Sequence, residues 1–217
     1  MKFLELFSGS HVMADAFKAH GWETYTVDWD PETDADLHAN IGQLVTSDII
    51  ELCHGVPDVI WASPDCTTYS VAAISKHRRQ DANNFLVPVS DYARTCDMIN
   101  THVMLLIAEL IEKGAKYYFV ENPRGAFRKM PFLEALPDRT MYTVTYCQYG
   151  ETRQKPTDLT TNHPNPRFKP PCKPGAPCHV RAPRGSKTGT QGIKGKLNRA
   201  RIPQALCEHI VEICEEE

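Results

Sequence analysis

Residues 2–21 read KFLELFSGSHVMADAFKAHG and decide the fold prediction. Residues 2–7 are short and apolar, which is typical of a buried strand, and they end at a Ser-Gly-Ser turn. Apolar side chains then recur at helical spacing from Val12 to Ala19, until Gly21 ends the run. A strand, a turn and a helix in this order are the first half of a βαβ crossover.

The same alternation continues along the chain. Strands are predicted at residues 23–27, 58–62 and 117–120, and helices at 92–113 and 204–213. Alternating strands and helices indicate an α/β, Rossmann-like fold: a mostly parallel twisted sheet with right-handed crossovers and helices on both faces. Residues 140–148 alternate between polar and apolar side chains, which predicts an antiparallel strand at the edge of this sheet.

Length and composition exclude several classes of protein. The chain has 217 residues, 41% of them hydrophobic, which is enough for one substantial core. It has neither a stretch of signal-peptide form nor an apolar window as long as a membrane span. The eight cysteines show no framework spacing, so we expect most of them to be reduced core thiols. We therefore expect a cytoplasmic protein without a membrane partner.

Charge is distributed unevenly. Residues 163–203 hold ten of the 24 Lys and Arg residues, none of the 27 Asp and Glu residues, and eight of the 16 prolines. This composition predicts a main domain at residues 1–162, a Pro/Gly-rich basic insert at 163–197, and a segment at 198–217 whose helix completes the main domain. A basic insert on an acidic body indicates binding to a polyanion, although a solvated basic loop remains the alternative.

Three groups of polar residues follow the carboxyl ends of predicted strands: FSGS at 7–10, SPDC at 63–66 and ENP at 121–123. Open α/β sheets bind ligands at this edge, so we expect one shared cleft. An acid after the second strand, Asp28 or Asp30, could accept from ribose hydroxyls, and the chain lacks a complete GxGxxG. These features favour a nucleoside ligand without phosphates, with Phe7 or Trp29 against its adenine or sulfonium.

Two of these groups offer reactive side chains. Cys66 lies in a turn where a helix N-terminus would lower the thiol pKa below about 8.5, while the neighbouring Asp65 acts in the opposite direction. An inert core thiol is the alternative. Glu121 ends an apolar strand, where it either pairs with a buried cation or has a raised pKa and donates a proton. It could also simply reach solvent or cap a helix.

Together these residues resemble the cytosine C5 methyltransferases, most closely the small phage-type or orphan members. LFSGS, Asp28-Trp29, SPDCTTYS, ENP, QYGETRQKPT and NRARIPQALCEHI resemble the family's motifs, in the family's order. The resemblance implies a fold of the S-adenosylmethionine-dependent methyltransferases, with that cofactor. It departs from the family at Asp65 and Pro123, where most members have proline and valine. The implied cofactor-binding residues are Phe7, Ser8, Gly9, Ser10, Asp28, Trp29, Asn40, Ser63 and Pro64.

The family's mechanism assigns roles to four residues. The Cys66 thiolate would add to carbon-6 of cytosine, and Glu121 would protonate or hydrogen-bond N3. Arg153 would hold the exocyclic carbonyl, and Asn122 would brace the glutamate loop. In DNA the cytosine must be turned out of the duplex. The alternatives are the same chemistry on RNA or on a free cytosine nucleotide, and a DNA-binding module that has lost catalysis.

The basic insert lies where larger relatives carry their target-recognition region, so the resemblance implies DNA as the partner, with a short or degenerate recognition site and no obligate protein partner. Within it, His163, Cys172, Cys178 and His179 lie close together in the sequence. Two cysteines and two histidines could bind structural zinc, a useful staple for a segment with little core. A loop with free thiols is the alternative.

Overall fold

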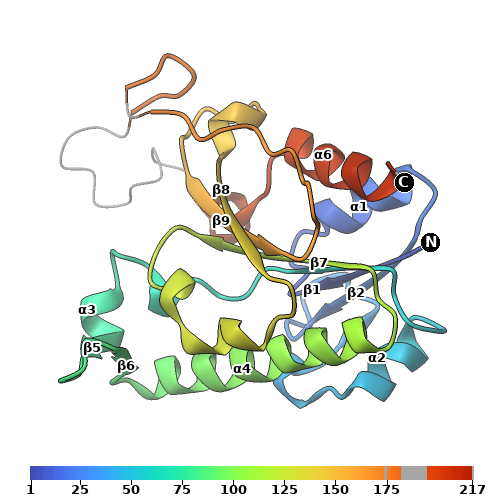
Figure 1. Ribbon diagram of the computed structural model, residues 1–217, viewed down its shortest axis with the longest axis horizontal. Coiled ribbons are helices and arrows are strands. Elements are labelled where there is room, and N and C mark those ends of the chain that lie inside the picture. Colours follow the sequence, from blue (N-terminus) through green and yellow to red (C-terminus); the bar gives the residue numbers. More distant parts are fainter. Residues whose placement is uncertain (174, 182–194, 217) are drawn as a thin grey trace.

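A computed structural model describes residues 1–173, 175–181 and 195–216 of the chain. Within these residues, seven strands form one sheet in the order β3-β2-β1-β4-β7-β9-β8 (Figure 1). Neighbouring strands from β3 to β7 are parallel, whereas β9 is antiparallel to both β7 and β8. This confirms the predicted α/β, mostly parallel sheet. The strands are β1 Lys2–Leu6, β2 Glu23–Asp28, β3 Leu37–His38, β4 Val59–Ala62, β7 Tyr117–Pro123, β8 Thr140–Thr145 and β9 Pro156–Thr161.

Helices cover both faces of the sheet (Figure 1). Helices α2 and α4 lie on one face, and α1 and α6 lie side by side on the other. A small hairpin of β5 Arg78–Gln80 and β6 Leu86–Pro88 extends from the start of α4. The helices are α1 Val12–Ala19, α2 Thr46–Leu52, α3 Ile74–His77, α4 Asp91–Glu112, α5 Lys196–Ala200 and α6 Gln204–Glu215, with 3-10 turns at Ile41–Gln43, Thr67–Tyr69, Phe127–Lys129, Pro131–Ala135 and Tyr146–Tyr149.

The strands supply one hydrophobic core on each side because successive side chains point to opposite faces. Leu4 of β1 and Tyr118 of β7 pack toward α4. Phe3 of β1 packs in the other core, where its ring stacks on Phe17 of α1 at 3.8 Å between centroids. Helix α6 shares this second core, so it packs together with residues of β1 and α1.

Two parts of the sheet differ from the prediction. Strand β9, PTDLTT, is not predicted because it is polar, yet it lies between β7 and β8 with nearly all its side chains buried. Asp158 can be buried there because Thr143 donates to it at 2.7 Å and Arg128 lies 3.5 Å away. Pairing with β9 also extends β7 three residues beyond the predicted end, so that Glu121 and Asn122 lie inside the ladder. None of the helices in the described residues combines the length and apolarity needed to cross a membrane.

Candidate active site

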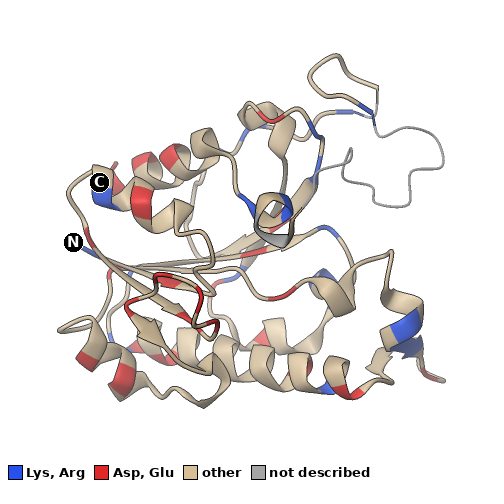
Figure 2. Ribbon diagram, turned by 180° about the vertical axis from the view of Figure 1, so that it is seen from behind, with Lys and Arg blue, Asp and Glu red and all other residues tan. Residues whose placement is uncertain are grey.

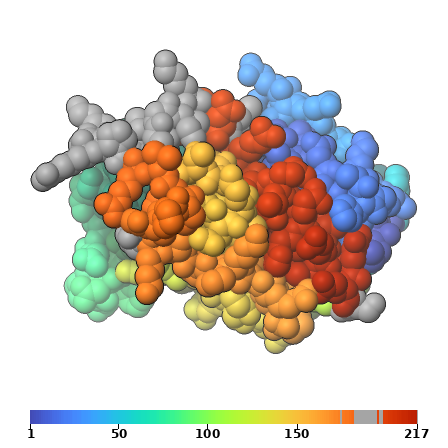
Figure 3. Space-filling view, turned by 90° about the horizontal axis from the view of Figure 1, so that it is seen from above, coloured from blue at the N-terminus to red at the C-terminus, as the bar shows by residue number. Residues whose placement is uncertain are grey.

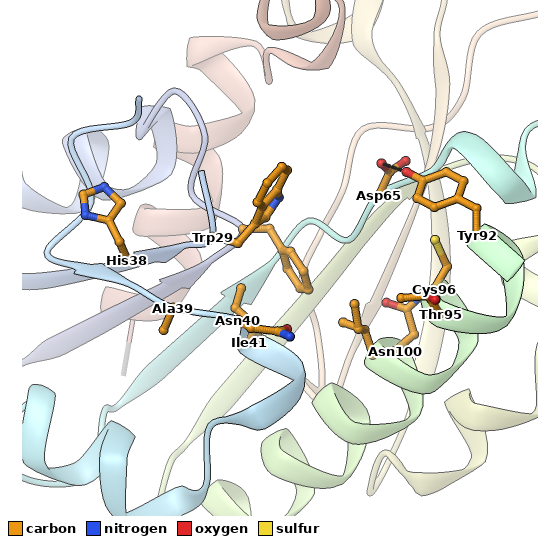
Figure 4. Close-up of a pocket in the computed structure, with 12 residues that line it drawn as sticks. Trp29, His38, Ala39, Asn40, Ile41, Asp65, Tyr92, Thr95, Cys96 and Asn100 are labelled. Atoms are coloured by element: carbon orange, nitrogen blue, oxygen red, sulfur yellow. Dashed lines mark hydrogen bonds between the residues drawn. The ribbon is translucent and has the colours of Figure 1, made fainter. Parts of the chain in front are cut away.

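A pocket of about 520 Å³ opens where β1 and β2 end, beside the first turns of α4. Figure 4 shows Trp29 and Asn40 on one side of it, and Asp65, Tyr92 and Cys96 on the other. Three of the predicted cofactor-binding residues, Phe7, Trp29 and Asn40, line this pocket. The full lining is Phe7, Trp29, His38, Ala39, Asn40, Ile41, Asp65, Tyr92, Thr95, Cys96, Ile99 and Asn100.

The glycine turn after β1 is fastened to β2. The Ser8 amide donates to the Val27 carbonyl at 3.2 Å. The Asp28 carboxylate accepts from the Gly9 amide at 2.9 Å and from the Asp30 amide at 3.0 Å. Gly9 has φ 50°, in the left-handed region that glycine adopts without strain. Asp28 therefore holds the turn, and its remaining lone pairs can still accept from hydroxyl groups of a ligand.

Cys66 follows β4 and precedes a single 3-10 turn, Thr67–Tyr69. Asp65 accepts from the Thr67 amide at 2.6 Å and from the Tyr92 hydroxyl at 2.6 Å. Burial, and then the charges of Glu121 and Asp65, raise the pKa of the Cys66 thiol to about 11. The expected lowering by a helix N-terminus is wrong, because a three-residue turn has almost no dipole to set against burial and two carboxylates.

Glu121 lies at the same edge of the sheet as the cysteine loop. Strands β4 and β7 are parallel neighbours, paired up to Ala62 and Val120, so both chains emerge side by side. Glu121 is buried, and the Tyr146 hydroxyl donates to its Oε1 at 3.0 Å. Burial raises the pKa of this carboxyl, although a charged Lys155 and the tyrosine act against the rise.

Asn122 connects the two loops. Its Nδ2 donates to the Pro64 carbonyl at 3.0 Å, two residues before Cys66, while its buried Oδ1 has no partner within the described part of the chain. This contact fixes the cysteine loop relative to the glutamate strand. The contact supports a bracing role for Asn122. Asn122 belongs to the glutamate strand, and the loop that its side chain braces is the cysteine loop.

The sequence itself points to relatives with the expected chemistry. No family model matches the chain. A protein of Frog virus 3 (isolate Goorha), named a probable DNA (cytosine-5)-methyltransferase, is 28% identical over 230 residues, which cover 99% of this chain and 100% of the viral protein. The resemblance to the cytosine C5 methyltransferase family is confirmed.

The likeness of this chain to solved structures concerns the fold alone. Entamoeba histolytica methyltransferase EhMeth matches with a TM-score of 0.53 and 12% identity, over 74% of this chain and 52% of that one. A mutant of Spodoptera frugiperda DNMT2 matches with a TM-score of 0.49 and 21% identity, over 79% of this chain and 53% of that one. S. pombe Dnmt2 matches with a TM-score of 0.49 and 12% identity, over 74% of this chain and 48% of that one. The chain therefore spans about half the length of these structures.

The pocket fits S-adenosylmethionine, the cofactor expected from the family. The Asn40 side chain lines the pocket and offers a polar group to a ligand. The Trp29 ring is 64% exposed and offers a face to adenine. The Asp65 carboxylate in the same pocket complements a sulfonium charge.

The remaining predicted cofactor residues do not line this pocket. Ser10 is exposed, and Gly9 contributes its amide to Asp28. The Ser63 hydroxyl accepts from the Trp61 indole at 2.7 Å. The Pro64 carbonyl accepts from Asn122, as described above. These residues shape the two turns around the pocket, and a direct contact between any of them and the cofactor stays a prediction.

Arg153 is bonded to other parts of the protein, while its charge also acts on Glu121, and its contact with the exocyclic carbonyl stays a prediction. Its guanidinium pairs with Glu151 and donates to the carbonyls of Arg199 at 2.8 Å and Arg201 at 3.2 Å. It thus ties the segment before α6 to the loop after β8. Lys155, two residues further along the QYGETRQKPT motif, is the cation whose charge acts on both Cys66 and Glu121. Burial lowers the pKa of Lys155, against the raising effect of Glu121.

Sequence reasoning missed Tyr146, the hydrogen-bond donor to Glu121. Tyr146 is buried, and the ammonium of Lys155 lies 4.4 Å from the centre of its ring. Its neighbours in the sequence, TYCQ, belong to the predicted edge strand, and nothing in that pattern indicates a contact with a strand 25 residues earlier. Only the pairing of β7, β9 and β8 brings these residues together.

The predicted metal ligands need one correction. His163 is buried against α6, where its Nε2 lies 3.0 Å from the Ile213 carbonyl and its Nδ1 accepts from the Asn165 amide at 3.3 Å. It therefore does not join the other three predicted ligands. Cys147 takes its place beside Cys172, Cys178 and His179. The sequence gives no signal for Cys147, which lies 25 residues before the insert's first cysteine.

Proposed function

We propose that this protein is an S-adenosylmethionine-dependent methyltransferase that acts on carbon-5 of cytosine in DNA. The observation that carries the proposal is the position of Cys66 and Glu121 just after the ends of the paired parallel strands β4 and β7, where Asn122 bonds the cysteine loop to the glutamate strand. A thiol and a protonatable carboxyl are the groups that activate a cytosine ring, and the ammonium of Lys155 adds a charge that acts on both.

The chemistry begins at Cys66. Its thiolate forms a bond to carbon-6, and the electrons of the C5–C6 double bond move toward N3, where Glu121 delivers a proton. The raised pKa of Glu121 favours the protonated acid that this step needs. The ring becomes an enamine with a nucleophilic carbon-5. S-adenosylmethionine would supply the methyl group there. Loss of the carbon-5 proton then re-forms the C5–C6 double bond and expels the Cys66 thiolate, and the N3 proton returns to Glu121.

Lys155 supports this reaction electrostatically. Its ammonium lowers the pKa of the Cys66 thiol, against the larger effect of burial. Its effect on Glu121 runs the other way for catalysis, because it lowers the pKa of the carboxyl that must be protonated, and burial outweighs it there. We assign to Lys155, rather than to Arg153, the role of holding the exocyclic carbonyl of the ring. The guanidinium of Arg153 is paired with the Glu151 carboxylate and bonded to two backbone carbonyls. The Lys155 ammonium also donates to backbone carbonyls, those of Arg199 and Ala200 at 3.3 Å each, but it carries a third N–H that can reach the ring.

Several features favour DNA as the substrate. The Frog virus 3 relative is named as a DNA methyltransferase. Exposed basic residues of the insert, including Arg167, Lys169, Lys173 and Arg181, suit contacts with phosphates. Figure 2 shows acidic residues concentrated on the helices and on the loop after β2, away from this segment. The rest of the predicted DNA-binding insert, residues 182–194, lies outside the described residues.

The test compares three acceptors of a tritiated methyl group from S-adenosylmethionine: duplex DNA rich in cytosine contexts, tRNA and dCMP. We expect transfer to DNA, and its loss in Cys66→Ser and Glu121→Gln but not in Asp91→Asn, a carboxylate on the exposed start of α4. Transfer to tRNA alone or to dCMP alone would overturn the assignment of DNA as the substrate. Absence of transfer to all three would overturn the enzymatic function and favour a binding module.

A further inference from the structure

We propose that Cys147, Cys172, Cys178 and His179 bind a structural zinc ion that fastens the basic insert to the methyltransferase domain. One sulfur or nitrogen atom from each residue lies within 4.8 Å of all the others. Cys147 belongs to the 3-10 turn after β8, whereas the other three residues come from the insert. The four ligands thus join two segments of the chain. This inference does not depend on the proposed function.

The distances between the ligand atoms fit a tetrahedral centre. The Cys147 sulfur lies 3.2 Å from that of Cys172 and 3.6 Å from that of Cys178. The Nδ1 atom of His179 lies 3.6 Å from both sulfurs of the insert. A tetrahedral zinc ion with Zn–S near 2.3 Å and Zn–N near 2.0 Å requires about 3.8 Å between sulfurs and about 3.6 Å from sulfur to nitrogen.

The chemistry of the ligands selects the metal. Three thiolates and one imidazole form a closed set that suits zinc, and hard cations such as magnesium prefer oxygen. A disulfide is the competing use of these cysteines, but its sulfurs would lie about 2.0 Å apart. The closest pair here is 3.2 Å apart, and all three cysteines of the cluster are free thiols.

Neighbouring polar groups are arranged to support charged sulfurs. The Gln154 side-chain amide donates to the Cys172 sulfur at 3.3 Å, and the Gln148 amide donates to the Cys178 sulfur at 3.5 Å. The backbone amide of Cys172 donates to the Thr145 hydroxyl at 3.0 Å, which fixes this residue against the end of β8. Hydrogen bonds of this kind orient metal ligands and stabilise thiolates.

A metal staple suits this part of the molecule. Residues 163–173 and 175–181 contain no helix or strand and few buried apolar side chains. The space-filling view in Figure 3 shows this segment, in orange, lying against the yellow surface that contains the turn of Cys147. Cys147 also follows Tyr146, the donor to Glu121. Zinc would therefore hold the insert and the wall of the active site in one fixed arrangement.

The test measures zinc by mass spectrometry in full-length protein purified from cells grown with added zinc. We expect about one zinc ion per chain in the unaltered protein. Cys172→Ser and His179→Gln should lower zinc affinity at least about tenfold, measured by competition with a chromogenic chelator. Cys66→Ser and His163→Gln are matched controls, because each removes a cysteine or histidine outside the cluster, and both should retain the metal.

A variant that fails to fold would also lose zinc, so a second experiment uses the unaltered protein. After removal of zinc by a chelator, titration with cobalt(II) should produce the visible absorption of a tetrahedral thiolate complex, and zinc should abolish it. Zinc far below one ion per chain together with no cobalt spectrum would overturn the proposal. So would a Cys147–Cys172 disulfide in protein purified under reducing conditions, or loss of zinc in His163→Gln with retention in His179→Gln.

Discussion

Asp65 adds to the effects of burial and Glu121 that oppose ionisation of the Cys66 thiol. Most members of the family have proline at this position, whereas here a carboxylate adjoins Cys66 and is held by Tyr92 and the Thr67 amide. The structure thus combines a motif that positions the sulfur with a charge that opposes its ionisation. In compensation, the same carboxylate lies in the cofactor pocket, where it can attract a sulfonium.

Asp65→Asn should lower the pKa of the Cys66 thiol, which is about 11 in the unaltered protein, because one of the two carboxylates that raise it becomes neutral. The measurement is the rate of iodoacetamide alkylation of the Cys66 peptide between pH 7 and about pH 11, followed by mass spectrometry. Asp91→Asn is the control. An unchanged pH dependence in Asp65→Asn would show that Asp65 does not act on the thiol.

Lys155→Gln should lower the rate of methyl transfer about a hundredfold, because the site loses the ammonium that faces both Cys66 and Glu121. Lys155→Arg keeps the charge and should retain more activity. Single-turnover assays with equal cofactor saturation measure the effect, and thermal melting checks the fold. If Lys155→Gln were as active as the unaltered protein while Arg153→Gln was inactive, the role would return to Arg153.

The residues found from the sequence are those within motifs. Cys66, Glu121 and Asn122 follow strands that periodicity identifies, so their meeting at one sheet edge could be predicted. Tyr146 and Cys147 could not, because each acts on a partner brought near only by the antiparallel strands β8 and β9. The sequence offered four nearby ligands for zinc, but His163 is drawn into the core by its bond to Ile213.

At the scale of elements, buried polar strands limit what periodicity can predict. Strand β9 contains three threonines and an aspartate, and its burial is possible only because side chains from β8 and the Phe127–Lys129 turn meet the Asp158 carboxylate. The apolar strands β1 and β4 and the long helix α4 were predicted within about two residues, since their hydrophobic patterns alone determine which face is buried.

The first crossover contains a buried acid that makes the stability of the folded state depend on pH. Glu5 of β1 accepts from the Ala14 amide of α1 at 2.8 Å, and burial raises the pKa of Glu5 to about 8. The folded state therefore keeps a proton that the unfolded chain releases above pH 4.5. Since the folded state binds more protons between these values, stability falls as the pH rises from 4.5 to about 8.

Glu5→Gln should remove this dependence, because the amide does not titrate and can still accept from Ala14. Between pH 5 and pH 8.5 the free energy of unfolding of the unaltered protein should fall relative to the variant, by at most about 5 kcal/mol. Urea unfolding at the two pH values, followed by circular dichroism, measures it. Parallel changes in both proteins would show that Glu5 is not protonated in the folded state.

At the scale of the whole molecule, an acidic body carries a basic extension. The body's acids repel phosphates, so contact with a nucleic acid should concentrate on the exposed cations of the insert and its flanks. Helix α6 returns to the core beside α1, which anchors the far end of the insert to the domain. This arrangement gives affinity for a backbone, and few side chains for reading a base sequence.

The double variant Lys173→Gln with Arg181→Gln should reduce the salt dependence of DNA binding. If both cations contact phosphates, the slope of log K against log salt concentration should fall by about 2. Fluorescence anisotropy with labelled duplex between about 50 and 200 mM salt measures it. Lys18→Gln with Lys113→Gln, on α1 and after α4, changes the net charge equally and should leave the slope unchanged. If the two double variants had equal slopes of log K against log salt concentration, the insert would be excluded as the part of the protein that contacts DNA phosphates.

The central claim is that the Cys66 sulfur bonds covalently to the cytosine ring. Duplex DNA containing 5-fluorocytosine tests it most directly, because fluorine cannot leave carbon-5 as a proton does and the enzyme stays attached. With S-adenosylmethionine, we predict a protein–DNA complex that resists denaturation, with the DNA mapped by peptide mass spectrometry to Cys66, and no complex in Cys66→Ser. An active enzyme that forms no such complex, or one whose complex persists in Cys66→Ser, would contradict the account.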